Sequence, residues 1–211
     1  ELLLDYAAGS LAETWSLAVA AHLALCPTCR QAVSKFEAVG GQLMSAVTPV
    51  SVDDSLYESI VAATNVVDDG NVVSRPLPDS FDPNPILPEP LRSYVGGDVC
   101  SLEWQRLGFG AYQLLIPTSD EETTARLLRI PAGRPVPSHS HGGLELTLVF
   151  SGAFSDETGT YGRGDFQEAD ENIDHQPHAA AGEDCICLAV VDAPLRFKSL
   201  AARMVQPLIG I

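Results

Sequence analysis

The sequence has little positive charge. Only 12 of its 211 residues are lysine or arginine, whereas 28 are aspartate or glutamate, so the formal net charge is −16 at pH 7. Because a field of this sign repels phosphate, the composition argues against direct binding to nucleic acid. It favours instead a protein partner with a basic surface.

Long apolar runs are missing as well. The nearest to one, residues 15–25, is interrupted by Ser16 and His22 and falls short of the about 20 apolar residues that a membrane-spanning helix needs. The sequence therefore predicts no membrane segment. At 211 residues and 45% hydrophobic composition, it is long enough for one large or two small domains, each with its own core.

Cysteine is scarce, and its count is odd. The five cysteines form a C-x-x-C pair, Cys26 and Cys29, and a C-x-C pair, Cys185 and Cys187, while Cys100 stands alone. This pattern fits thiols that bind metal or take part in redox chemistry better than a secreted disulfide framework. The expected location is the cytoplasm.

Residues 2–46 have the apolar spacing of helices. A short first helix ends at Gly9. The segment Ser10-Leu-Ala-Glu13 reads as a capping box, which predicts that a second helix begins at about Leu11. This helix must end near Cys26, because Pro27 disfavours a helical conformation for the residue before it.

Two more helices are expected before residue 65. One begins at about residue 28 and continues to about residue 39, where Gly40-Gly41 breaks or kinks it. The other spans residues 55–64, with Asp53 or Asp54 as its N-cap and a one-sided apolar stripe. That stripe packs on the first three helices or docks on a partner.

The corner between the second and third helices carries a metal-binding pattern. His22 lies one helical turn before Cys26, and Cys29 follows at the start of the next helix. One nitrogen and two sulfurs are donors that zinc prefers, and the alternative is a helix pair with two buried thiols and a core histidine. A fourth ligand could come from Asp5, Glu13, solvent or a residue before Glu1.

The composition changes after residue 65. Residues 66–90 are rich in proline and predict a stiff, extended linker. From residue 91 onward, short alternating runs are separated by glycine, proline and aspartate, as in a β-sandwich or barrel. The predicted fold class is α + β in two domains, with about four helices at residues 1–65 and an all-β domain at residues 91–211.

A second metal-binding pattern lies in the β-region. His139 and His141 are two apart, so a strand would place both imidazoles on one face, with Glu145 on that face too if the strand resumes in register after Gly142-Gly143. Two imidazoles and a carboxylate outline a metal site. The alternative is a pair of solvated loop histidines beside a surface glutamate.

With its flanking glycines, Gly133 and Gly152, this stretch resembles the first motif of the cupin superfamily. The resemblance implies a small jelly-roll barrel whose second motif supplies one more histidine. That motif is degenerate here and leaves His175 and His178, which are three apart and cannot share a strand face. We favour His175, with His178 as its substitute.

Three histidines and one glutamate suit zinc, manganese, iron or nickel about equally. The sequence leaves open whether an unknown small ligand also binds in the barrel.

A helical domain with His22, Cys26 and Cys29, followed by a linker and a cupin domain, resembles the ChrR family of zinc-dependent anti-sigma factors. The resemblance implies a cytoplasmic repressor whose zinc domain sequesters an extracytoplasmic-function type sigma factor. It further implies that the cupin domain mediates release under oxidative stress such as singlet oxygen. In that family the fourth zinc ligand is a histidine upstream of the first helix, at a position that precedes Glu1.

Two questions stay open at this point. The cupin domain could instead be a metalloenzyme, such as a dioxygenase or isomerase, with the helices as an appendage. Cys185 and Cys187 share one strand face and either fill the core or act as redox sensors.

Overall fold

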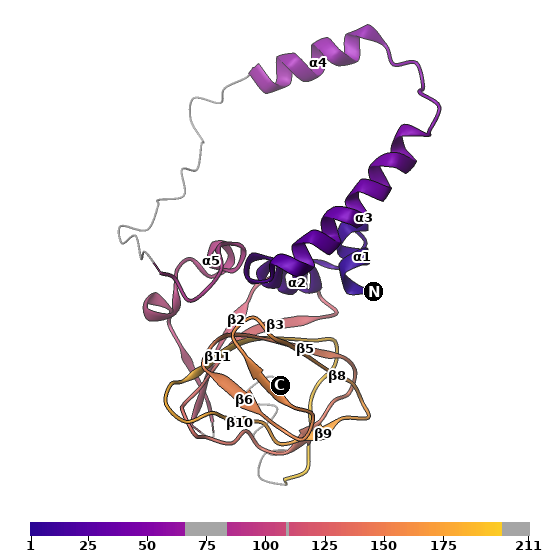
Figure 1. Cartoon of the computed structure of the whole chain (residues 1–211). Helices are drawn as coiled ribbons and strands as arrows, with labels where there is room; N and C mark the ends of the chain where they lie inside the picture. The colour runs from indigo at the N-terminus through magenta and orange to yellow at the C-terminus, as the bar shows by residue number, and fades with distance from the viewer. Residues whose placement is uncertain (66–83, 109, 200–211) are drawn as a thin grey trace.

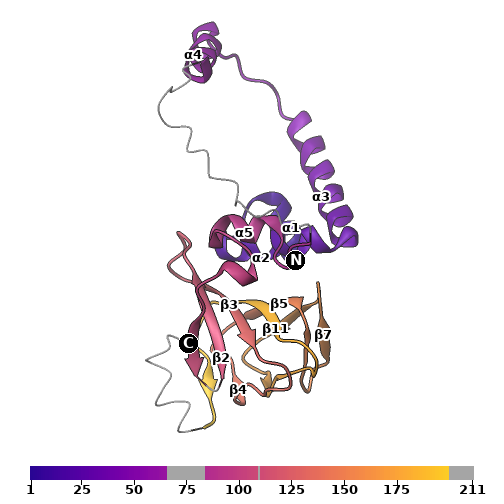
Figure 2. The same ribbon diagram turned by 90° about the vertical axis from the view of Figure 1, so that its left-hand side faces the viewer.

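The computed structural model describes residues 1–65, 84–108 and 110–199. The N-terminal helices are α1 (Leu2–Ala8), α2 (Glu13–Leu25), α3 (Pro27–Ser45) and α4 (Asp54–Asn65). A short helix, α5 (Glu89–Val95), and a 3-10 turn, η1 (Val99–Ser101), lead into the β-structure. Figures 1 and 2 show α1, α2 and the start of α3 against one side of the β-structure, while α4 stands well away from it.

The remaining elements form antiparallel sheets. The largest sheet has six strands in the order β1-β2-β3-β11-β5-β8, and two sheets of three strands, β10-β6-β7 and β12-β4-β9, complete the domain. We call residues 84–199 the β-domain. The strands are β1 (Gln105–Gly108), β2 (Ala111–Ile116), β3 (Thr124–Ile130), β4 (His139–Ser140), β5 (Glu145–Ser151), β6 (Ala153–Ser155), β7 (Thr160–Gly162), β8 (Phe166–Ala169), β9 (Asp174–His175), β10 (His178–Ala179), β11 (Cys185–Val191) and β12 (Arg196–Phe197). The predicted α + β fold class, with helices first and β-structure after, is confirmed.

The central strands β5 and β11 of the six-stranded sheet are buried on both faces. On β11, Ile186, Leu188 and Val190 belong to a cluster that includes side chains of α2, whereas Cys185 and Cys187 belong to a second cluster inside the β-domain. A strand covered on both faces shows a continuous apolar run instead of alternation. The period of two expected for this region therefore does not hold for β11 or for β5, where all five residues between the ends are buried.

Helix α2 connects the helical part to the sheet. Leu17, Ala18 and Ala21 pack into the cluster on the outer face of the sheet. Val19 and Leu23 point the other way and pack with Val33 of α3 and with side chains of α1. Because α2 is apolar on both sides, the helical part and the β-domain share one core.

The start of α2 differs from the capping-box prediction. The Ser10 hydroxyl donates back to the Asp5 carbonyl at 3.1 Å, and α2 begins at Glu13 after Ala12, which provides no side-chain cap. The prediction was wrong because the Glu13 carboxylate has another partner. It accepts hydrogen bonds from the Ser119 amide at 2.6 Å and the Tyr94 hydroxyl at 2.7 Å, across the contact with the β-domain.

Helix α3 also differs from the prediction, since it continues through Gly40-Gly41 to Ser45. A glycine inside a helix costs about 1 kcal/mol relative to alanine but does not forbid the helix. The other helix ends agree with the sequence: α2 ends at Leu25, and Asp53 caps α4 by accepting from the Ser55 amide at 2.8 Å.

The expected linker falls into two parts. Residues 66–83 lie outside the described residues. Residues 84–90 are packed, because Leu87 is fully buried and the amides of Ile86 and Leu87 both donate to the Asp98 carboxylate at 2.9 Å. Across the described ranges, no helix combines the length and apolar character that crossing a membrane requires.

Candidate metal centres

The first candidate centre lies at the corner between α2 and α3. His22 is in the last turn of α2, Cys26 is the residue between the helices, and Cys29 is in the first turn of α3. One donor atom from each residue lies within 4.8 Å of the other two. Pro27 makes this possible, since it ends α2 and starts α3 at once. The predicted group His22, Cys26 and Cys29 is thus brought together, and we call it the N-terminal centre.

Two observations show that this group suits a metal ion. The Nδ1 atom of His22 is buried without a hydrogen-bond partner, which is costly unless another group binds it. The Cys29 amide donates to the Cys26 sulfur at 3.5 Å and lowers the pKa of the Cys26 thiol. A lowered pKa favours the thiolate, which is the form that binds metal.

Within the parts of the chain that the structure describes, the N-terminal centre has three members. Neither Asp5 nor Glu13 belongs to it, and Glu13 is held by Ser119 and Tyr94 instead. The sequence expectation that either could be the fourth ligand therefore finds no support in the geometry.

The N-terminal centre lies against the β-domain. The His22 ring packs on the Phe166 ring of β8 with centroids 4.9 Å apart. Gly164, just before β8, has a φ of +88°, and a side chain there would meet Leu25 at 3.7 Å. A shift of β8 would therefore change the packing of His22, a residue of the N-terminal centre.

The second candidate centre is inside the β-domain. His139 on β4 and His175 on β9 are cross-strand partners, and His141 follows β4 by one residue. The Nε2 atom of His175 lies 3.1 Å from the Nε2 atoms of both His139 and His141. Nitrogens bound to one tetrahedral ion at about 2.0–2.1 Å would be about 3.3 Å apart, so this spacing suits a metal. We call these residues the three-histidine centre.

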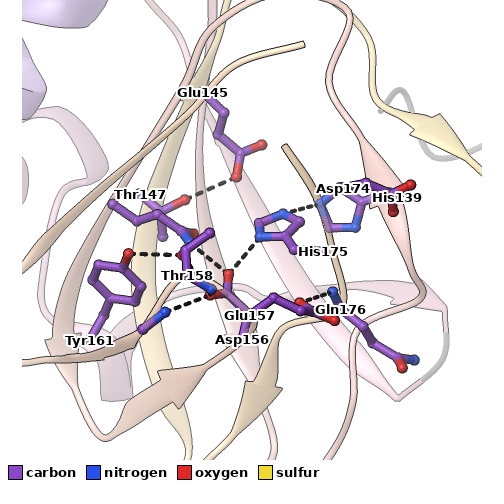
Figure 3. Close-up of polar contacts among 12 residues, drawn as sticks. His139, Glu145, Thr147, Asp156, Glu157, Thr158, Tyr161, Asp174, His175 and Gln176 are labelled. Atoms are coloured by element: carbon purple, nitrogen blue, oxygen red, sulfur yellow. Dashed lines mark hydrogen bonds and ion pairs between the residues drawn. The ribbon is translucent and has the colours of Figure 1, made fainter. Parts of the chain in front are cut away.

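Hydrogen bonds to neighbouring groups fix the orientation of two of these imidazole rings. The His175 Nδ1 donates to the Asp156 carboxylate at 2.6 Å (Figure 3). The His139 Nδ1 donates to the Pro137 carbonyl at 2.8 Å. In both rings this leaves the Nε2 lone pair directed at the centre, as in metal-ligating histidines.

Asp156 stays charged while it holds His175. Burial opposes its ionisation, but hydrogen bonds from Thr158, Gln167 and His175 outweigh burial and lower the pKa of Asp156 to about 2. Gln167 donates to it at 2.6 Å from β8, the strand that contacts His22. Sequence reasoning missed Asp156, because it lies 19 residues from His175 and no local spacing connects the two.

Glu145 lies beside the centre but outside the tight group. Its Oε2 is 3.6 Å from the buried Nδ1 of His141, which has no hydrogen-bond partner, and its Oε1 accepts from the Thr147 hydroxyl at 3.0 Å. Figure 3 shows the Glu145 carboxylate directed toward the His139–His175 pair. Its role as a fourth ligand stays a prediction from the sequence pattern, because the clustered donor atoms are those of the three histidines.

His178 does not take part. Its side chain is exposed, and its Nδ1 donates to the Gln176 carbonyl at 2.8 Å. Of the two histidines in the degenerate motif, the structure brings His175 to the centre.

A cavity of about 110 Å³ adjoins the three-histidine centre. His139, Glu145 and His175 form part of its wall, together with Cys187. Cys185 and Cys187 are buried on the inner face of β11, and the Cys185 side chain together with burial raises the pKa of Cys187 well above its usual value. The Cys187 thiol is therefore held protonated.

A helical corner with a candidate metal-binding group, packed on an antiparallel β-domain with three clustered histidines, defines the class, a cupin-like β-domain preceded by a helical domain. Three comparisons identify the family within it. Residues 94–194 match the family model of the ChrR cupin-like domain. The anti-sigma-E factor ChrR of Cereibacter sphaeroides is 46% identical over 210 residues, which cover 100% of this chain and 95% of that protein.

The third comparison is structural. A chain of the crystal structure of Rhodobacter sphaeroides SigE in complex with the anti-sigma ChrR superposes with a TM-score of 0.77. It is 44% identical, and the match covers 90% of this chain and 95% of that chain. The chain described here belongs to the ChrR family of anti-sigma factors, which confirms the resemblance seen in the sequence.

Proposed function

We propose that the chain is a zinc-dependent anti-sigma factor that sequesters an extracytoplasmic-function type sigma factor through its helical domain, residues 1–65. Membership of the ChrR family supports this role, since a relative forms a complex with SigE. The observation that carries the proposal is a set of exposed apolar side chains on α3, on α4 and on the segment between them, which we call the α3–α4 apolar surface. It consists of Phe36, Val39, Leu43, Met44, Val47, Val50, Val52, Leu56, Tyr57 and Ile60, all exposed.

This α3–α4 apolar surface is arranged to bind another protein. Phe36, Val39 and Leu43 follow one another at helical spacing along α3, and Leu56 and Ile60 do so along α4. Figures 1 and 2 show that the C-terminal half of α3 and all of α4 stand away from the rest of the described chain. Apolar helix faces of this extent are typical of docking surfaces.

Zinc at the N-terminal centre would fix the angle between α2 and α3. The ion would join the end of one helix to the start of the next, and its binding would be coupled to the folding of this small helical unit. The net charge of −16 suits a sigma factor whose own surface is basic, because such a surface binds DNA.

The β-domain, in this proposal, mediates release under oxidative stress such as singlet oxygen. The three-histidine centre, with zinc, manganese, iron or nickel, is its candidate sensor. A chain of contacts leads from His175 through Asp156 and Gln167 to β8, whose Phe166 touches His22. A change at one centre can therefore alter packing at the other. The protein would act in the cytoplasm, where its sigma factor works.

The proposal is tested by co-expressing the chain with the extracytoplasmic-function type sigma factor that it is proposed to bind. Cys26→Ser should abolish the complex and release transcription, because the N-terminal centre loses a ligand. Cys100→Ser is the matched control, since Cys100 is exposed and belongs to neither centre. Full repression by Cys26→Ser would contradict a zinc-dependent mode of binding.

A second candidate function is a cupin metalloenzyme of dioxygenase or isomerase type. The cavity beside the three-histidine centre favours it, because a bound metal with an open position can activate oxygen or polarise a carbonyl. Turnover or oxygen consumption by iron- or manganese-loaded protein, lost in His141→Ala, would support an enzyme. If no such metal gives activity, the idea should be dropped.

A further inference from the structure

We propose that the cavity of the β-domain binds a small organic carboxylate, whose charge is balanced by Arg126 and whose compact apolar body fills the space beside the three-histidine centre. This site is separate from the sigma-binding surface, and its test does not depend on sigma-factor binding.

Arg126 is placed in the cavity wall by the register of the sheet. It points inward from β3 together with Leu128 and Ile130, whereas Ala125 and Leu127 face the cluster beneath α2. Only 4% of Arg126 is exposed. A buried guanidinium is costly and is rare in a cavity wall, so its position beside the three-histidine centre makes Arg126 the group that a bound anion would meet.

A row of cross-strand partners surrounds Arg126. Arg126 pairs with Ala189 on β11, Ala189 pairs with Thr147 on β5, and Thr147 pairs with Gln167 on β8. All four line the cavity. The side chain of Ala189 is a single methyl group. It therefore leaves space between the Arg126 guanidinium and the polar groups of Thr147 and Gln167 further along the row.

Polar groups hold the guanidinium in this position. Its Nη1 donates to Gln113 Oε1 at 2.9 Å, and Gln113 sits on β2 with only 5% of its surface exposed. Glu145 acts on Arg126 as a nearby opposite charge. The cation is therefore fixed before any ligand arrives, which reduces the entropic cost of binding.

The charges around the cavity favour an anion. Among the charged groups of the cavity wall and the three-histidine centre, Arg126 and Glu145 line the cavity and Asp156 holds His175, which gives one positive and two negative charges. A divalent ion bound by His139, His141 and His175 would add two positive charges and would leave an excess of one positive charge. Burial makes such an excess unfavourable, and a monoanion would neutralise it.

The remaining side chains of the cavity wall are mostly apolar, so they favour a ligand whose body is also apolar. These side chains include Leu107, Leu128, Ile130, Val136, Phe154 and Phe197. The volume of about 110 Å³ is below the about 150 Å³ of engineered cavities that hold benzene, so the enclosed part of the ligand must be compact. The cavity is partly open to the surface, so it suits a short branched chain or a single ring whose far edge stays near the opening.

The test uses three isosteric probes that differ in charge: 4-fluorobenzoate, 4-fluorobenzamide and 4-fluorobenzamidinium. Their binding to the zinc-loaded full-length chain is measured by fluorine NMR titration. The benzoate should bind at least about tenfold more tightly than the amide, as expected for hydrogen bonds to a charged group, and the amidinium should not bind. If no probe binds, or the amide binds as tightly as the benzoate, the proposal is wrong.

Variants locate the binding site. Arg126→Gln should remove the preference for benzoate over benzamide, and Arg126→Lys should keep part of it. Arg106→Gln is the matched control, because Arg106 is exposed on β1, and it should behave as the wild type. A benzoate preference that survives Arg126→Gln would overturn the assignment.

A further variant covers the case in which Arg126→Gln does not fold. Ala189→Leu keeps the arginine but fills the space beside it, and should weaken benzoate and benzamide together by about tenfold or more. Unchanged binding of both probes to Ala189→Leu would place the site elsewhere and contradict the proposal.

Discussion

The shared core of the two domains makes a quantitative prediction. Leu17 of α2 is 4% exposed and packs among side chains of the six-stranded sheet, including those of Leu127, Leu148 and Leu188. The Leu17→Ala substitution removes apolar atoms from this contact and leaves a cavity between helix and sheet. If the two domains are held together here, the loss should destabilise the whole chain and not the helices alone.

The magnitude follows from the burial of Leu17. Replacing a buried leucine by alanine costs about 2–5 kcal/mol, and we expect about 3 kcal/mol in the free energy of unfolding. For a chain of this length, that loss corresponds to a fall in Tm of roughly 6–12 °C. Leu43→Ala is the matched control, because Leu43 is 67% exposed on α3. Its effect should stay within about 0.5 kcal/mol.

The assay is thermal and denaturant unfolding followed by two probes, circular dichroism for the helices and tryptophan fluorescence. Trp15 lies on α2 and Trp104 in the β-domain, and both pack against the shared core. Wild type and Leu17→Ala should each unfold in one transition, with Leu17→Ala at lower temperature and lower denaturant. Two separate transitions, with the one from the β-domain unchanged in Leu17→Ala, would refute the shared core.

Three further predictions address individual side chains. Hydrogen bonds from Ser119 and Tyr94 lower the pKa of Glu13 below its ordinary value of 4.5 in the folded protein. The stability that this contact contributes is therefore fully present above pH 4.5 and is lost as the pH falls through the pKa of Glu13 in the folded state. Glu13→Gln should make the free energy of unfolding depend less on pH in this acid range. Asp156→Asn should weaken metal binding at the three-histidine centre by about 10–100-fold in a chelator competition, because His175 loses its orienting carboxylate. Leu43→Arg should weaken sigma-factor binding in a pull-down without lowering Tm, since Leu43 is exposed in the α3–α4 apolar surface; an unchanged complex would exclude that part of the surface from the interface.

The sequence predicted what is encoded locally. His22, Cys26 and Cys29 lie within eight residues, and the turn enforced by Pro27 is enough to gather them. His139 and His141 followed from strand periodicity in the same way. The choice of His175 over His178 depended on a resemblance, and the cross-strand pairing of His139 with His175 explains why His175 is the one that lies beside His139.

What the sequence did not predict depends on contacts between distant segments. Glu13 resembled a capping residue, yet it binds Ser119, which is 106 positions away. Asp156 and Arg126 gain their roles only when β-strands from different parts of the chain meet. The unbroken apolar runs of β5 and β11 arise because helices cover the outer face of the sheet. No local sequence pattern predicts that these helices pack there.

The central claim is that zinc at the N-terminal centre organises the sigma-binding surface. Its most direct test starts from the purified complex of the sigma factor with a His139→Ala variant, in which the three-histidine centre is disabled. A chelator is added, and zinc release and dissociation of the complex are followed together. We predict that the sigma factor dissociates in step with the loss of one zinc ion per chain; a complex that stays intact after the zinc has left would contradict the account.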